Sequence, residues 1–133
     1  MHEITYKELW KDWMTSSPDH PLLLASKERL SQYSKDDWDM ISADAAHLNQ
    51  MLGELVLYNI PLDSKVAELL FDSFIEHFNK WFFPVNQRFL FVFARVCVND
   101  YKYVIFFDES CPGLAKYLSQ LLKLHLHKVP EFL

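Results

Sequence analysis

Hydrophobic side chains recur along most of this chain at intervals of three and four residues, the spacing of one face of an α-helix. The longest such stripe consists of Trp38, Ile41, Ala45, Leu48, Leu52 and Leu55. A second stripe has the same spacing and consists of Ala67, Phe71, Phe74, Phe78 and Trp81. The two stripes predict two long amphipathic helices, each with one apolar face.

Polar and turn-forming residues mark the ends of these two helices. Ser34 precedes an acidic segment in which Asp37 stands three positions later, an arrangement that resembles a capping box. Asp63 or Ser64 is expected to cap the second helix after a break in the pattern. Pro84 predicts an end or a kink at the other end of that helix.

The first thirty residues predict two shorter helices joined by a loop. Residues 4–14 form an amphipathic pattern in which Tyr6, Trp10 and Trp13 share one face with Leu9. Residues 15–21 contain two prolines and several turn formers, which is typical of a loop. A helix over 22–31 follows.

The stretch between the second long helix and the C-terminal region is ambiguous. Residues 89–93 and 103–107 are rich in aromatic and β-branched side chains, and Asn99-Asp100 between them suits a hairpin turn. Local propensity therefore favours two strands slightly over a helix buried on all sides. Beyond this stretch, Ser110-Cys111-Pro112 predicts a cap and a first-position proline for a last helix, which Pro130 stops.

The composition excludes several classes of function. The chain has 133 residues, which suits a single domain, and its 13 Lys and Arg against 18 Asp and Glu leave a net charge of −5. A protein without a basic block is not expected to bind nucleic acid, because phosphate binding needs clustered Lys and Arg. The only glycines, Gly53 and Gly113, lie far apart, so the chain has no glycine-rich phosphate loop.

Neither a membrane segment nor a secretory signal is visible. The longest apolar run, residues 89–94, falls far short of the roughly 18 residues that span a bilayer. The N-terminal residues lack the basic and apolar regions of a signal peptide. Cys97 and Cys111 fit reduced thiols better than a disulfide framework, so we predict a cytoplasmic protein. Cys97 lies in an apolar stretch and is expected to be inert, whereas Cys111 near a helix start is a minor candidate for a reactive thiol.

The titratable residues do not form a recognisable catalytic or metal-binding set. The six histidines include no pair with the spacing of zinc ligands. A lone histidine such as His47 or His77 is more often a hydrogen-bonded residue at the surface or its boundary. No ordered set of nucleophile, base and orienting group is present, so we predict a protein that is not an enzyme and has neither metal nor cofactor.

Five segments in matching order and spacing resemble one known family. They are Tyr33–Trp38, Ile60–Ser64, Trp81–Phe83, Val98–Tyr103 and Pro112–Leu118. The sequence resembles the TipAS antibiotic-recognition domain, the ligand-binding part of certain MerR-type transcriptional regulators. The resemblance covers about residues 22–124, and residues 1–21 hold the N-terminal helix and the proline-rich loop.

The resemblance implies an all-α, globin-like fold without haem, in which a groove binds thiopeptides or other bulky apolar antibiotics. It therefore predicts helices for residues 89–93 and 103–107, against their local propensity. Regulators of this family carry a winged helix-turn-helix ahead of the domain, and the chain has no room for one before residue 22. A stand-alone binding protein without direct nucleic-acid contact is expected.

The ligand chemistry is expected to differ from that of some family members. A cysteine that can attack a thiopeptide in those members corresponds to Val85 here, so covalent capture at that position is not available. Residues 86–89 also depart from the family pattern. We expect Asn79, Asn86 and Gln87 to supply polar contacts to a ligand, and Arg88 and Arg95 to hold acidic groups at the rim of the groove.

Eight side chains are candidates for the ligand site. Five would line the groove, namely Trp81, Phe82, Val85, Phe89 and Phe93. Consecutive residues Trp81, Phe82 and Phe83 point in different directions on a helix, so at least one is expected to face a groove or a partner. Tyr6, Trp10 and Trp13 would close over an apolar ligand as a lid. The alternatives are that the rings are ordinary core and that the first helix is permanently packed.

The predicted function is recognition of a bulky apolar small molecule, such as a peptide antibiotic, by a sensor or sequestering protein. The alternative is a protein–protein interaction module, in which exposed rings form a homodimer or bind a separate DNA-binding chain.

Overall fold

The computed structural model describes the backbone of residues 4–16 and 21–131, and the side chains of residues 4–13 and 26–131. These residues form α-helices and their connections, with no strand among them. The helices are α1 (Tyr6–Ser16), α2 (Pro21–Ser31), α3 (Lys35–Leu57), α4 (Lys65–Trp81), α5 (Gln87–Asn99), α6 (Tyr101–Ser110) and α7 (Leu114–His125), followed by the short 3-10 helix η1 (Leu126–Lys128). The predicted all-α class is confirmed.

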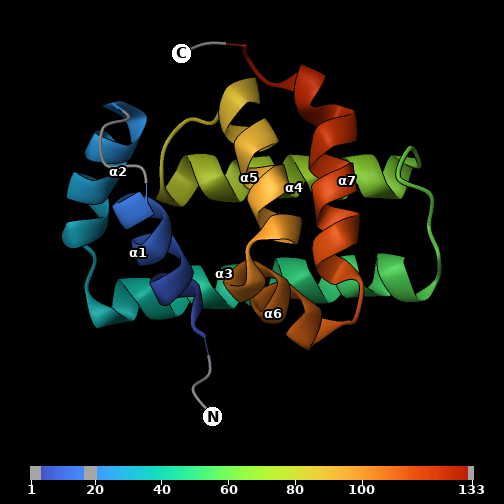
Figure 1. The fold of residues 1–133 in the computed structure, drawn as a ribbon, viewed down its shortest axis with the longest axis horizontal. Coiled ribbons are helices and arrows are strands. Elements are labelled where there is room, and N and C mark those ends of the chain that lie inside the picture. The colour runs from blue at the N-terminus through green and yellow to red at the C-terminus, as the bar shows by residue number, and fades with distance from the viewer. Residues whose placement is uncertain (1–3, 17–20, 132–133) are drawn as a thin grey trace.

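Two pairs of helices make up the body of the fold. The long helices α3 and α4 run antiparallel, and α5 and α7 lie side by side across them (Figure 1). Helices α1 and α2 lie at one end of α3, and α6 packs against α5, α7 and α3 (Figure 1). The innermost side chains come from the four helices of the body and include Ile41, Leu52, Ala67, Leu90, Leu118, Leu121 and Leu122, all with no exposed surface.

The two long helices begin where the sequence predicts. The Ser34 hydroxyl accepts a hydrogen bond from the Asp37 backbone N–H, and the Asp37 carboxylate accepts one from the Ser34 N–H, which completes the capping box. Ser64, rather than Asp63, caps α4 by accepting from the Ala67 N–H. Each cap satisfies backbone donors that a helix start leaves unpaired.

The preference for strands at residues 89–93 and 103–107 is wrong, and the helices implied by the family resemblance are correct. Helix α5 buries Phe89, Leu90, Phe93, Ala94 and Cys97, at helical spacing. Some of its exposed positions are also apolar: Phe91 is 47% exposed and Val92 is 41% exposed, beside the exposed Arg88 and Arg95. Apolar residues on both the buried and the exposed side make the helical period harder to distinguish from the alternation of a strand.

The start of the last helix also differs from the prediction. Helix α7 begins at Leu114, so Pro112 lies before the helix and not at its first position. The residue at the cap is Gly113, with φ of +90°, a conformation that favours glycine. The helix ends at His125 and continues as η1 before Pro130.

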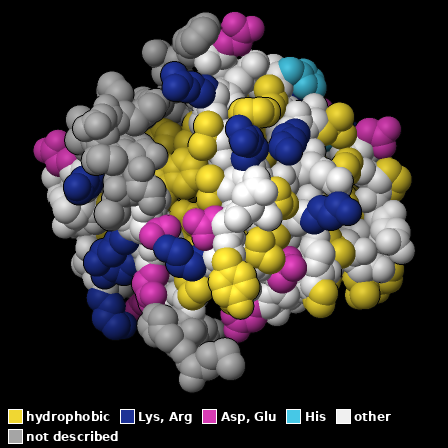
Figure 2. All heavy atoms as spheres, in the orientation of Figure 1, with side chains coloured by type: hydrophobic (Ala, Val, Ile, Leu, Met, Phe, Trp, Pro, Cys, Tyr) yellow, Lys and Arg dark blue, Asp and Glu magenta, His cyan; other side chains and the backbone are white. Residues whose placement is uncertain are grey.

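No helix in the described part of the chain is long and apolar enough to cross a membrane. On the face seen in Figure 2, Lys and Arg side chains are scattered among acidic and hydrophobic ones. This distribution agrees with the absence of a basic block in the sequence.

Candidate functional site

The candidate site is built around the C-terminal end of α4, where the chain leaves the helix. Trp81 is the last residue of α4, and Phe82 and Phe83 follow it outside the helix. Both phenylalanines are buried, at 1% and 4% exposure. The argument that three consecutive rings cannot face one core therefore does not apply, because the backbone turns after Trp81.

Side chains of α2 and of the connection between α2 and α3 hold this turn in place. The Tyr33 hydroxyl donates to the Trp81 carbonyl, and the Arg29 guanidinium donates to the Phe82 carbonyl at 3.2 Å and to the Lys80 carbonyl. These bonds satisfy acceptors that a helix end leaves free. The turn fixes Phe82 under the N-terminal helix.

The three rings of α1 lie against this surface. Trp10 stacks on Phe82 with ring centroids 3.7 Å apart and an interplanar angle of 18°. The Phe93 and Phe89 rings are nearly parallel to the Trp10 indole, at 6.0 and 6.4 Å. Trp13 packs against both phenylalanines, with centroids 5.6 Å from each. Tyr6, Trp10 and Trp13 therefore share the buried face that their spacing predicts.

A polar chain that runs from the buried Tyr6 and His77 to the partly exposed Asp44 anchors the start of α1. The Tyr6 hydroxyl lies 2.8 Å from His77 Nε2, and His77 Nδ1 lies 2.6 Å from the Asp44 carboxylate. A carboxylate only accepts, so Nδ1 carries the proton, Nε2 is an acceptor, and the Tyr6 hydroxyl donates to it. Burial lowers the pKa of His77 and outweighs the opposing effect of Asp44, while burial raises the pKa of Tyr6. The ring is thus neutral and fixed in one tautomer.

Two further contacts hold α1 to α6. The Tyr103 hydroxyl donates to the Leu9 carbonyl at 3.1 Å, and Lys102 Nζ lies 2.6 Å from the Asp12 carboxylate. Burial raises the pKa of Tyr103, so its hydroxyl stays a donor. Hydrogen bonds and an ion pair therefore hold the N-terminal helix to the body at Tyr6, at Leu9 and at Asp12.

The rings leave almost no space between them. A cavity of about 10 Å³ remains, lined by Tyr6, Leu9, Trp10, Trp13, Phe93, Tyr103 and Phe107. That volume is at most the room of one water molecule. Trp13 lines this cavity, and its buried indole Nε1 has no hydrogen-bond partner among the described residues. An antibiotic does not fit into this cavity among the described rings in the present conformation.

Seven of the eight predicted site residues belong to the buried core, and Trp81 is set apart from them. Trp81 is only partly buried, and its ring neighbour among the described aromatic side chains is Tyr33, edge-on at 6.1 Å. The Trp81 indole Nε1 is also buried and has no hydrogen-bond partner in the part of the chain that the structure describes. Val85 is 3% exposed, and its backbone N–H donates to the Asn79 side chain.

The three predicted polar ligand contacts all serve the fold. Asn79 Oδ1 accepts from the Val85 N–H, Asn86 Oδ1 caps α5 by accepting from the Phe89 N–H, and Gln87 Nε2 donates to the Val129 carbonyl. Each amide group therefore already has an intramolecular partner in this structure.

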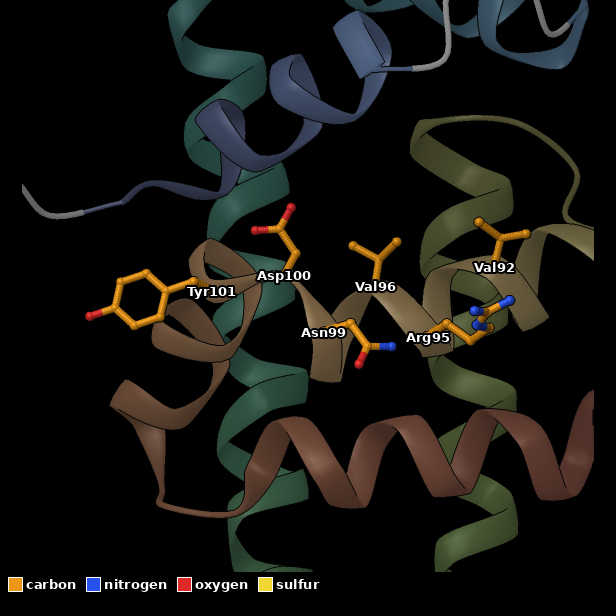
Figure 3. Close-up of a pocket in the computed structure, with 6 residues that line it drawn as sticks. All are labelled: Val92, Arg95, Val96, Asn99, Asp100 and Tyr101. Atoms are coloured by element: carbon orange, nitrogen blue, oxygen red, sulfur yellow. The ribbon is translucent and has the colours of Figure 1, made fainter.

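A larger pocket lies outside the ring cluster, where α5 meets α6 (Figure 3). It has a volume of about 500 Å³, is open to solvent, and is lined by Val92, Arg95, Val96, Asn99, Asp100 and Tyr101. Arg95 here lies 5.9 Å from the Phe91 ring. Tyr101 is 77% exposed, so this pocket is a shallow surface feature and not an enclosed site.

Sequence reasoning missed His77 and Asp44. His77 is 3% exposed, so its assignment to the surface or its boundary was wrong. The available signal was its position three residues after Phe74 and four before Trp81, on the apolar stripe of α4. Its partners could not be identified from spacing, because they lie 71 and 33 positions away in the chain.

The described part of the chain contains no group of three or more metal-ligating side chains placed to hold an ion. Both cysteines are free thiols, and Cys97 is fully buried, which raises the pKa of its thiol as expected for an inert cysteine.

Comparison with known families identifies the domain. The family model of the TipAS antibiotic-recognition domain matches residues 6–125, which is most of the chain. The chain belongs to the TipAS family. The match includes α1, so the N-terminal helix is part of the TipAS domain as the family model defines it.

A solved structure has the same fold as this TipAS domain. It is TipAS of Streptomyces lividans in complex with nosiheptide, described as part of a thiopeptide antibiotic multidrug resistance system. The match has a TM-score of 0.82 at 18% identity and covers 95% of this chain and 88% of the other. The comparison with curated proteins gives no significant match.

Proposed function

We propose that this TipAS domain binds a bulky, largely apolar small molecule of the thiopeptide type and acts as a sensor or a sequestering protein. The observation that carries the proposal is the layer of aromatic rings between α1 and the body, because stacked aromatic surface suits ligands rich in flat rings. Membership of the antibiotic-recognition family supports it, and the solved relative was determined with a thiopeptide bound.

The proposed ligand-binding side chains are those predicted from the sequence. They are Tyr6, Trp10, Trp13, Trp81, Phe82, Val85, Phe89 and Phe93. We propose that binding involves no catalysis, no cofactor and no nucleic acid, and that it occurs in the cytoplasm. The two free thiols and the net charge of −5 support the last two points.

Titration with nosiheptide tests this function. Tryptophan fluorescence should change on binding, because Trp10 and Trp13 lie in the proposed site. A Phe89→Leu variant should bind nosiheptide roughly fivefold more weakly, because it loses one aromatic contact. Phe71→Leu is the matched control, because Phe71 is also buried but packs against His125 and Lys128. Failure of nosiheptide and other thiopeptides to bind would reject the proposal.

A homodimer is the second candidate function. The observation that favours it is a set of exposed apolar side chains where α3 ends and α4 begins, namely Leu57, Tyr58, Val66 and Leu69. Exposed apolar surface of this kind is often covered by a partner. Sedimentation equilibrium distinguishes the two states, and a Leu69→Glu variant should shift a genuine dimer to monomer.

A further inference from the structure

Helices α5 and α7 carry positive charge on a chain whose net charge is −5. Neither helix contains an Asp or Glu residue. Their outward positions hold four exposed cations, Arg88, Arg95, Lys116 and Lys123. None of the four forms an ion pair with another residue in the described part of the chain. A partner that supplies carboxylates can therefore pair with all four.

The fold arranges these four cations as two pairs. Helices α5 and α7 run antiparallel and side by side (Figure 1), and a hydrogen bond between residues near their middles fixes their register. This register places Arg95 close to the level of Lys116, and Arg88 close to the level of Lys123. Along each helix the two cations are seven residues apart, which is two turns or about 10 Å. The cations therefore stand at the four corners of the α5–α7 surface.

Exposed apolar side chains stand between and beside these cations. On α5, Phe91 is 47% exposed and shares the outward face with Arg95, which lies 5.9 Å from its ring. Val98 on α5 and Leu124 on α7 are also exposed. Figure 2 shows Lys and Arg side chains beside hydrophobic ones over these two helices. Apolar surface of this kind, bordered by charges of one sign, is typical of a binding surface.

A hollow of about 430 Å³ adjoins the two lysines, where α5, α6 and α7 meet. Its apolar lining includes Val98 and Val104, and Lys116 and Lys123 line it as well. The Asp108 carboxylate also lines it, but accepts a hydrogen bond from a backbone N–H at the start of α7. The pocket of Figure 3 runs along the other side of α5. Such hollows admit side chains that project from a protein segment, and their concave shape favours such a segment over a lipid surface.

We propose that the outward surface of α5 and α7 binds an acidic amphipathic helix of another protein. Asp or Glu side chains two turns apart on that helix pair with the cations, and an apolar side chain between them enters the hollow. The spacing of the cations along α5 and α7 equals that of positions i and i+7 on a helix laid beside them. The surface faces away from the ring cluster beneath α1, so this inference does not depend on antibiotic binding.

Three synthetic helical peptides of about 20 residues test the chemistry of this partner. The first has a stripe of Leu flanked by Glu residues two turns apart, the second has Gln in place of Glu, and the third has the Glu residues moved opposite the stripe. In fluorescence anisotropy at low salt, the first should bind roughly tenfold more tightly than the other two, and added salt should weaken it. Equal affinities, or no binding of the first peptide, would overturn the proposal.

A pair of double variants tests whether the peptide binds at this surface. Arg95→Gln with Lys116→Gln removes one cation from each helix and should weaken binding of the first peptide roughly fivefold. Lys27→Gln with Lys65→Gln is the matched control, because it removes the same charge from exposed positions on α2 and α4 and should leave the affinity unchanged. An equal loss in both double variants would show attraction to the whole molecule and would overturn the assignment to α5 and α7.

Vesicles of phosphatidylglycerol and phosphatidylcholine distinguish a protein partner from an anionic lipid surface. Under the conditions in which the first peptide binds, the protein should stay in the supernatant when the vesicles are sedimented. Vesicle binding that Arg95→Gln with Lys116→Gln reduces would overturn the choice of a protein helix and assign the surface to anionic lipid. The same double variant should bind nosiheptide as wild type does, so failure of this inference leaves the proposed function standing.

Discussion

Replacing Trp10 with alanine should release α1 without unfolding the rest of the domain. Trp10 is 2% exposed and stacks on Phe82, so the substitution removes a nearly fully buried indole. Truncation of a buried tryptophan costs about 3–5 kcal/mol. Helix α1 has 11 residues, fewer than the roughly 12–15 at which isolated helices become even marginal, so its order depends on this contact. The innermost leucines of the body come from other helices and keep their neighbours.

Hydrogen exchange followed by mass spectrometry measures this effect segment by segment. Because each 1.4 kcal/mol is a factor of ten, protection in α1 should fall by roughly 10²–10⁴-fold, or to the rate of an open chain if its protection is smaller. Protection in α5 and α7 should change little.

Trp38→Ala is the matched control for this experiment. Trp38 is 5% exposed and belongs to α3, so its truncation should lower protection throughout the body. The reasoning would be refuted if Trp10→Ala lowered protection in α5 and α7 as much as in α1. Helix α1 would then unfold only together with the body.

Three further experiments, on a helix cap, on the two glycines and on pH, test the local structure. Ser34→Ala removes the hydroxyl of the capping box and should lower the free energy of unfolding by about 0.5–2 kcal/mol in urea titrations. Gly113→Ala places a side chain at φ of +90° and should destabilise the fold by about 1 kcal/mol, whereas Gly53→Ala, inside α3 with ordinary contacts, should stabilise it by up to about 1 kcal/mol in the same assay. Burial lowers the pKa of His77, so the unfolded chain takes up a proton below about pH 6.5 before the folded chain does. The free energy of unfolding should therefore fall between about pH 7.5 and 5.5, and by less in His77→Gln; an equal fall in both proteins would contradict this assignment.

The two long helices could be predicted from the sequence because their inner and outer positions differ in polarity. In α3 the buried Ile41 and Leu48 alternate with exposed Asp39 and His47, so the helical period is plain. In α5 some outward positions, such as Phe91 and Val92, are also apolar, and the same rule gives an ambiguous result. The resemblance to a helical family was needed there, since local propensity cannot report which face a neighbouring helix covers.

The candidate site could be predicted in part. The spacing of Tyr6, Trp10 and Trp13 correctly predicts one buried face, because a helical period relates residues close in the chain. That this face fills the space next to Phe82 could not be predicted, since the two segments are far apart in the sequence and their packing is a property of the fold. The hydrogen-bonded chain of Tyr6, His77 and Asp44 could not be predicted from the sequence for the same reason.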